Sequence, residues 1–162
     1  MSLEKRKIGF LGGSFDPVHI GHLVMAETAY HAYDLEKVLF IPAYHPPHKL
    51  NKERSADSRV KMLEIALDDN KHFNLDLREI NARTINYTSD TVRTLKKDYP
   101  DCELFCIVGE DSFLQIETWH LWEDLLSMVT IVAVRRPDIL HIDTDGNNIY
   151  KKAEKLRKNG YK

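Results

Sequence analysis

Short apolar runs alternate with amphipathic segments along this chain. Continuous apolar runs are typical of strands covered on both faces, and they occur at residues 8–11, 38–41, 104–108 and 129–134. Residues 73–77 alternate between apolar and polar side chains, which predicts a half-exposed strand. Apolar residues at helical spacing predict helices at residues 20–33, 55–67 and 89–97, followed by a short basic helix at 149–158 with little to bury. Ser55 or Asp57 is available to cap the second helix.

The alternation of strands and helices predicts an α/β fold. We expect a Rossmann-like, doubly wound parallel sheet of about five strands, with helices on both faces and right-handed crossovers. Ligands bind such sheets in a crevice at the carboxyl ends of the strands, so functional residues should follow strands directly. No interdomain linker interrupts the chain, which predicts one domain over residues 1–162 with a weaker pattern over 138–162.

Composition restricts the kind of ligand. A formal charge of −2 creates no general field that would select nucleic acid or an anionic membrane, so an anion site must be local. No stretch approaches the ~20 apolar residues of a membrane span, and the first residues lack the apolar core of a signal peptide. We therefore expect a cytoplasmic protein. Cys102 and Cys106 have no histidine cluster beside them and are expected to be plain thiols rather than metal ligands.

A glycine turn follows the first predicted strand. Gly12 and Gly13 let a phosphate approach the backbone without a Cβ in the way, and the next helix directs its free N–H groups at that space. His19 and His22 are three residues apart at the start of this helix, so both imidazoles can face the same side, with room left by Gly21. The alternative is that one histidine caps the helix and the other is a surface residue. The neighbouring glycines and strand favour a phosphate site.

The string Gly12-Gly13-Ser14-Phe15-Asp16-Pro17-Val18-His19-Ile20-Gly21-His22 matches the signature of the nucleotidylyltransferase superfamily. It lacks the lysine and serine or threonine of a Walker A loop and the glycine spacing of a dinucleotide fingerprint. Within the superfamily, His45-Pro46-Pro47-His48-Lys49, Tyr87-Thr88, Gly109-Glu110-Asp111 and Trp119 resemble motifs of the bacterial nicotinate-mononucleotide adenylyltransferases, in the same order. The resemblance covers residues 7–137 and implies one nucleotidyltransferase domain.

This resemblance implies a reaction in NAD biosynthesis. ATP would transfer AMP to nicotinate mononucleotide, forming deamido-NAD and pyrophosphate, with Mg²⁺ bridging the ATP phosphates rather than held by protein ligands. The implied catalytic residues are His19, His22 and Lys49. The implied ATP-binding residues are Gly12, Gly13, Ser14, Phe15, His19, His22, His45, Lys49, Gly109 and Asp111. Partners would be ATP and nicotinate mononucleotide, without nucleic acid or membrane; assembly into a homo-oligomer stays open.

The resemblance also implies residues that hold the mononucleotide: Tyr87, Thr88, Asp111, Trp119, His120 and Arg136. A flat indole at Trp119 can stack on a pyridine ring, whereas Trp122 is expected to pack a helix. Arginine suits the mononucleotide phosphate through its two-pronged donors. From local chemistry alone, Thr88 or Ser89 is expected to cap a helix, a role compatible with binding a carboxylate at the same helix end.

The family's last motif has no match here. That motif reads isoleucine, serine, serine, threonine, two variable residues and arginine, and Arg157 is the sole arginine after Pro137. We expect that the sequence has been cut short; the alternative is a variant in which another group does the same work. Loss of such donors is expected to lower the rate by about 100-fold or more.

Two other functions stay open at this point. A pantetheine-phosphate adenylyltransferase would share the glycine-histidine turn but not the proline-histidine loop or the paired tryptophans. A binding module would keep the mononucleotide pocket without ATP chemistry, and the unmatched last motif leaves room for it.

Overall fold

A parallel sheet forms the centre of the computed structural model, which describes residues 5–44, 54–135 and 149–162. Its strands lie in the order β3-β2-β1-β4-β5, and each neighbouring pair is parallel. The strands are β1 (Arg6–Gly13), β2 (Lys37–Pro42), β3 (Phe73–Leu75), β4 (Cys102–Gly109) and β5 (Thr130–Val134). The predicted doubly wound α/β fold is therefore confirmed.

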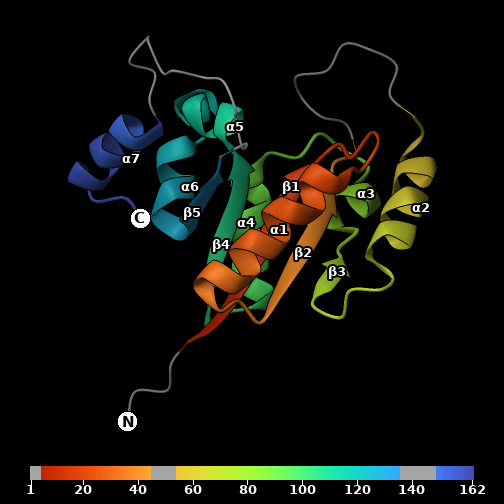
Figure 1. Cartoon of the computed structure of the whole chain (residues 1–162). Helices are drawn as coiled ribbons and strands as arrows, with labels where there is room; N and C mark the ends of the chain where they lie inside the picture. The colour runs from red at the N-terminus through yellow and green to blue at the C-terminus, as the bar shows by residue number, and fades with distance from the viewer. Residues whose placement is uncertain (1–4, 45–53, 136–148) are drawn as a thin grey trace.

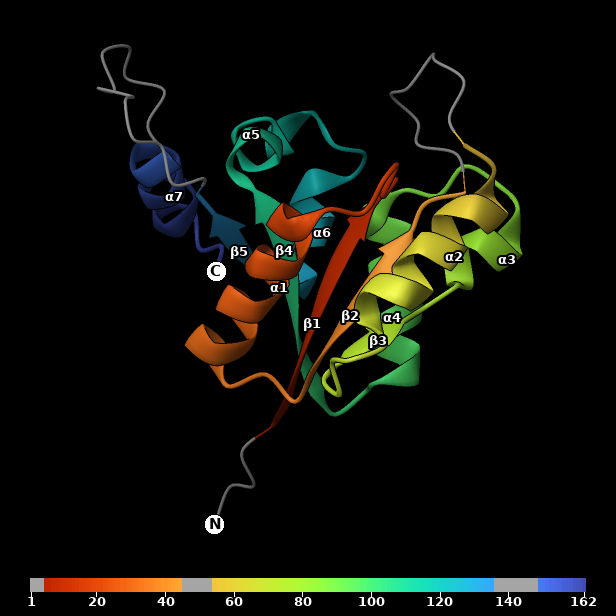
Figure 2. The same cartoon turned by 45° about the vertical axis from the view of Figure 1, so that its right-hand side comes forward.

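Helices cover both faces of this sheet (Figures 1 and 2). Buried side chains of α1 and α2 belong to one core cluster, and those of α4, α5, α6 and α7 belong to the other. The helices are α1 (Ile20–Tyr33), α2 (Ala56–Leu67), α3 (Arg78–Ala82), α4 (Thr88–Asp98), α5 (Glu110–Leu114), the 3₁₀ turn η1 (Ile116–Thr118), α6 (Trp122–Met128) and α7 (Ile149–Lys158). Within the described residues, none of them has the length and apolarity needed to cross a membrane.

Strand alternation divides the core between the two faces. Ile8 and Phe10 of β1 belong to the cluster beneath α4, whereas Leu11 belongs to the cluster beneath α1. In β4, Cys106 and Ile107 likewise face opposite clusters, and both are buried. Because both faces are covered, the central strands read as continuous apolar runs.

Three local expectations meet different outcomes. Ser55 is the N-cap of α2 and its Oγ accepts a hydrogen bond from the Ser58 amide at 3.2 Å, as expected. The strand expected at 73–77 is shorter, because the chain turns into α3 after β3. The prediction that residues 149–158 have little to bury was wrong, since Ile149 and Leu156 of α7 are buried in the same core cluster as residues of α5 and α6. Two apolar residues seven apart suffice for this contact.

The strand order changes direction between β1 and β4. From β1 the chain passes outward to β2 and β3, and it returns to the other side of β1 to form β4 and β5. Gly13 ends β1 and Gly109 ends β4, so glycines occupy both strand ends at this switch point. Crevices of doubly wound sheets open at such a point.

Candidate functional site

Two adjoining cavities open at the carboxyl ends of β1 and β4. One has a volume of about 330 Å³ and the other about 760 Å³. Residues that line both include Gly12, Gly13, Ser14, Ser112 and Trp119. The two cavities therefore form the two lobes of one crevice, with the glycine turn and Trp119 at their junction. Their volumes lie in the range of small-molecule sites.

The two histidines of the glycine turn lie side by side. Their ring centroids are 3.8 Å apart, and both rings line the larger lobe. His19 is the N-cap of α1, and its amide donates to Nδ1 of His22 at 3.2 Å. One histidine thus does hold the capping position, as the alternative required, but the second does not point away from it. Phe15, which is buried, packs its ring edge-on against His22 at 4.9 Å.

His22 is a neutral imidazole at physiological pH. Burial is the main cause that lowers its pKa to about 4, and the nearby His19 adds to the effect. Because Nδ1 accepts the His19 amide hydrogen, the single proton of the neutral ring belongs on Nε2. His22 is therefore a hydrogen-bond donor that keeps its form across neutral pH.

The glycines differ in what surrounds them. A Cβ placed on Gly12 would meet no heavy atom closer than Ile41 O at 4.0 Å, whereas one on Gly21 would meet the His19 ring at 3.0 Å. Gly12 thus leaves open space above the turn, and Gly21 leaves room for an imidazole.

Arg135, directly after β5, also lines the larger lobe, with its Nε 3.8 Å from a Glu110 carboxylate oxygen.

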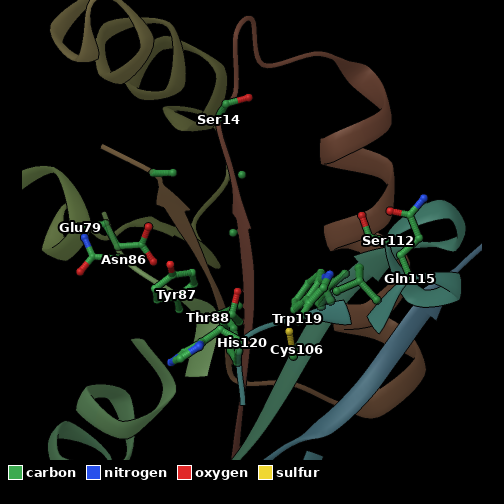
Figure 3. Close-up of a pocket in the computed structure, with 16 residues that line it drawn as sticks. Ser14, Glu79, Asn86, Tyr87, Thr88, Cys106, Ser112, Gln115, Trp119 and His120 are labelled. Carbon is green, nitrogen blue, oxygen red and sulfur yellow. The ribbon is translucent and has the colours of Figure 1, made fainter. Parts of the chain in front are cut away.

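Aromatic side chains line the smaller lobe (Figure 3). Trp119 lies on one side, and the rings of Tyr87 and His120 lie together on the other, with centroids 4.3 Å apart. Thr88 lines the same lobe as the first residue of α4. The expected Thr88 or Ser89 cap was wrong, because Tyr87 is the N-cap and no side chain caps this helix. The first amides of α4 are therefore not occupied by a capping side chain.

Several lining residues of the smaller lobe were not predicted: Glu79, Asn86, Ser112 and Gln115. Glu79 accepts a hydrogen bond from Thr91 Oγ1 at 2.5 Å, and burial, as the main cause, raises the pKa of its carboxyl group. Glu79 comes from α3, whose brevity leaves no hydrophobic periodicity to detect. Ser112 lies one residue beyond Asp111, which was predicted in its place.

The remaining residues that were predicted to bind ATP or the mononucleotide have different positions. Asp111 is exposed on α5 and lines neither lobe among the described residues. His45, Lys49 and Arg136 lie outside the described residues. Gly109 lines the larger lobe.

The cysteines are ordinary core residues. Cys102 and Cys106 are both free and buried, although Cys106 reaches the wall of the smaller lobe. Burial raises the pKa of the Cys106 thiol to about 12, so it is not a thiolate nucleophile at neutral pH. Among the described residues, no group of three His, Cys, Asp or Glu side chains is placed to hold a metal ion.

Trp122 has a different role from Trp119. It begins α6, packs against the core cluster and lies 5.9 Å from the ring of Tyr161. The expectation that Trp122 packs a helix is confirmed.

Comparisons with known proteins agree on one family. A family model described as cytidylyltransferase-like matches residues 10–159. A Bacillus pumilus protein named "Probable nicotinate-nucleotide adenylyltransferase" is 45% identical over 134 residues, covering 82% of this chain and 70% of that protein. A Bacillus cereus protein of the same name is 44% identical with the same coverage.

A solved structure has the same fold. The Plasmodium falciparum nicotinic acid mononucleotide adenylyltransferase complexed with NaAD matches with a TM-score of 0.73 and 20% identity, covering 91% of this chain and 71% of that one. Fold, glycine-histidine turn and sequence identity thus lead to one conclusion. The chain belongs to the cytidylyltransferase-like family and, within it, to the nicotinate-nucleotide adenylyltransferases.

Proposed function

We propose that this protein transfers AMP from ATP to nicotinate mononucleotide, forming deamido-NAD and pyrophosphate. The observation that carries the proposal is the pair of imidazoles 3.8 Å apart beside the open backbone of Gly12, in a crevice with two lobes. The relatives' shared name supports this acceptor over pantetheine phosphate.

The two lobes divide the substrates. The smaller lobe offers Trp119, Tyr87 and the start of α4, which suit a flat pyridine ring and its carboxylate. The larger lobe offers His19, His22 and Arg135, which suit ATP. Since the glycine turn borders both, the acceptor phosphate and the α-phosphorus of ATP would meet above Gly12 and Gly13.

The reaction needs no covalent enzyme intermediate. An oxygen of the mononucleotide phosphate forms a bond to the α-phosphorus, and the bond from that phosphorus to the oxygen bridging the β-phosphorus breaks, so pyrophosphate leaves with the electron pair. The attacking phosphate is already ionised at neutral pH, so alignment and charge stabilisation can suffice. His22 Nε2–H would donate to the phosphate oxygens, with His19 beside it.

We propose Mg²⁺ as the accompanying ion. It prefers phosphate oxygens and water to an all-protein cage, and it would neutralise charge on the ATP phosphates. The donor set of the crevice, imidazoles and backbone amides with few carboxylates, fits a metal carried by the nucleotide. We also propose that the protein acts in the cytoplasm on these small molecules, without nucleic acid or membrane.

The proposal is tested by measuring pyrophosphate release with ATP and Mg²⁺ and either nicotinate or nicotinamide mononucleotide. We expect release with the nicotinate form, because the helix end favours a carboxylate. No pyrophosphate from either acceptor would overturn the proposal.

Calorimetry separates this enzyme from a binding module. Binding of both ATP and the mononucleotide is expected for an adenylyltransferase. Mononucleotide binding with no measurable ATP binding would support the module instead.

A further inference from the structure

The largest of the fully buried side chains is a charged one, Arg59. Its relative exposure is 1%, and it lies in the first turn of α2, outside both lobes of the crevice. A buried guanidinium is costly unless its donors are satisfied. No carboxylate forms an ion pair with Arg59 among the described residues. The cost of burying this guanidinium must therefore be offset by hydrogen bonds to groups other than carboxylates.

Four backbone carbonyls satisfy this guanidinium. Nη1 donates to Ser14 O at 2.7 Å and to Ala43 O at 2.8 Å. Nη2 donates to Tyr44 O at 3.1 Å, and Nε donates to Arg54 O at 3.3 Å. Four of the five N–H donors of the side chain are thereby used. Lysine carries one point charge and cannot span these four directions.

The acceptors lie at the edge of the crevice. Ser14 lines both lobes and Ala43 lines the smaller one. The Ala43 amide also donates to Gly13 O at 2.8 Å, which ties the end of β2 to the glycine turn. Tyr44 and Arg54 stand on either side of residues 45–53, so one guanidinium fixes both points where that segment joins the described fold.

A second tie from the same region holds the turn. The Arg54 side chain and amide both donate to the Asp16 carboxylate, at 2.6 and 3.1 Å. The start of α2 is thus fastened to the glycine turn through Asp16 from outside and through Ser14 from inside. Because both ties end on the turn, a shift of α2 would move the backbone that borders the crevice.

We propose that Arg59 is a positioning residue for adenylyl transfer: from within the fold, it holds the Ser14 and Ala43 backbone at the crevice edge and so places the glycine turn against nucleotide phosphate. This inference rests on the proposed function. Arg59 touches no substrate in this arrangement and acts through the carbonyls it binds.

The test compares Arg59→Lys with Leu63→Ala. Leu63 is buried one turn further along α2, in the core cluster beneath α1, and it lines neither lobe of the crevice, so its truncation lowers stability without removing a crevice residue or a hydrogen bond to the turn. We expect Arg59→Lys to lower kcat/KM for ATP by at least 10-fold. Leu63→Ala, at a comparable loss of thermal stability, is expected to stay within 2-fold of the wild type. Equal losses in both variants would show that Arg59 matters for stability alone and would overturn the proposal.

Hydrogen exchange provides a readout that needs no activity. Amides of residues 12–16 and 41–44 are expected to exchange at least 10-fold faster in Arg59→Lys than in Leu63→Ala under native conditions. Unchanged exchange there would contradict the proposal. If the wild type itself transfers no AMP, the proposed function fails, and the exchange result still decides whether Arg59 holds the turn.

A measurement on the wild type covers the case in which the Arg59→Lys variant does not fold. The Nε–H of Arg59 is expected to exchange slowly with water, and its nitrogen resonance is expected to shift when an ATP analogue with a methylene between the α- and β-phosphorus atoms binds. Rapid exchange, or no shift at saturating analogue, would count against the proposal.

Discussion

At the scale of single residues, the surroundings of His22 set both its charge and the position of its proton. The His19 amide fixes which nitrogen carries the proton, and burial keeps the ring neutral. A neutral donor attracts phosphate less strongly than a cation would. Because its pKa is low, however, the ring does not take a proton from the phosphate or from water near neutral pH. The imidazole therefore offers the same hydrogen to the crevice throughout neutral pH.

Replacing His22 with alanine should lower kcat for pyrophosphate release by about 10²–10³-fold, the usual cost of one donor to developing charge. His31→Ala provides the control, because His31 lies at the exposed end of the same helix and pairs with Glu27. Initial rates at saturating substrates measure the effect. A His22→Ala enzyme with the kcat of the His31→Ala control would remove His22 from the chemistry.

The lowered pKa of His22 also makes stability depend on pH. In the unfolded chain the pKa of His22 is near its ordinary value of 6.5, whereas in the folded protein it is about 4. The free energy of unfolding should therefore fall as the pH drops from 7 to 5, by about 1 kcal/mol from this group, because partial exposure to solvent screens the full shift. His22→Asn lacks the group, so urea unfolding at both pH values should show a smaller acid loss for that variant. An equal loss in both proteins would place the pKa of His22 near its ordinary value.

At the scale of the secondary-structure elements, β1 uses its glycines for two different purposes. A Cβ on Gly9 would lie 2.7 Å from Leu35 Cδ1 and 3.2 Å from Ile107 Cδ1, in the core beneath α1. A Cβ on Gly12 would meet only open space. Gly9 thus allows close packing in the core, whereas Gly12 leaves space free at the crevice.

This difference predicts opposite effects of the same substitution. Gly9→Ala should lower the free energy of unfolding by about 1–3 kcal/mol, because an added methyl group strains a filled core. Gly12→Ala should leave stability within about 0.5 kcal/mol and raise KM for ATP, because its methyl group occupies the space for phosphate. Thermal unfolding and substrate titration of the two variants measure both effects. Unchanged kinetics in a folded Gly12→Ala protein would mean that phosphate does not approach the backbone there.

At the scale of the whole molecule, α7 completes the core on the side of β5. Leu156 is 5% exposed, and the Lys152 and Lys155 side chains of the same helix pair with Glu117 of η1. The Ile131 amide of β5 donates to Lys162 O at 3.2 Å, so the residues after α7 lie beside the edge strand. This segment is therefore part of the packed fold.

Leu156→Ala should accordingly cost about 2–4 kcal/mol of unfolding free energy, as buried leucines do elsewhere. Arg157→Ala, at the next and exposed position, should cost less than about 0.5 kcal/mol. Urea unfolding of both variants checks the contrast. Similar values for the two would mean that α7 contributes little to the core.

The sequence by itself determined the strands, the longer helices α1, α2, α4 and α7, and the glycine-histidine turn of this protein. Strands covered on both faces, such as β2 and β4, are continuous apolar runs, and the turn joins a glycine pair to two histidines at one spacing. These features depend on neighbours along the chain. Local pattern therefore suffices to predict them.

Only the tertiary structure decided which distant residues meet. Glu79 reaches the smaller lobe because α3 lies beside the end of β2, and Arg59 is buried because three separate segments turn their carbonyls toward it. Leu156 is buried in the core, although the sequence pattern of a short basic helix does not predict this burial. Most of the partners in these contacts are far apart in sequence, and the free energy of each contact depends on burial, which a local sequence pattern does not reveal.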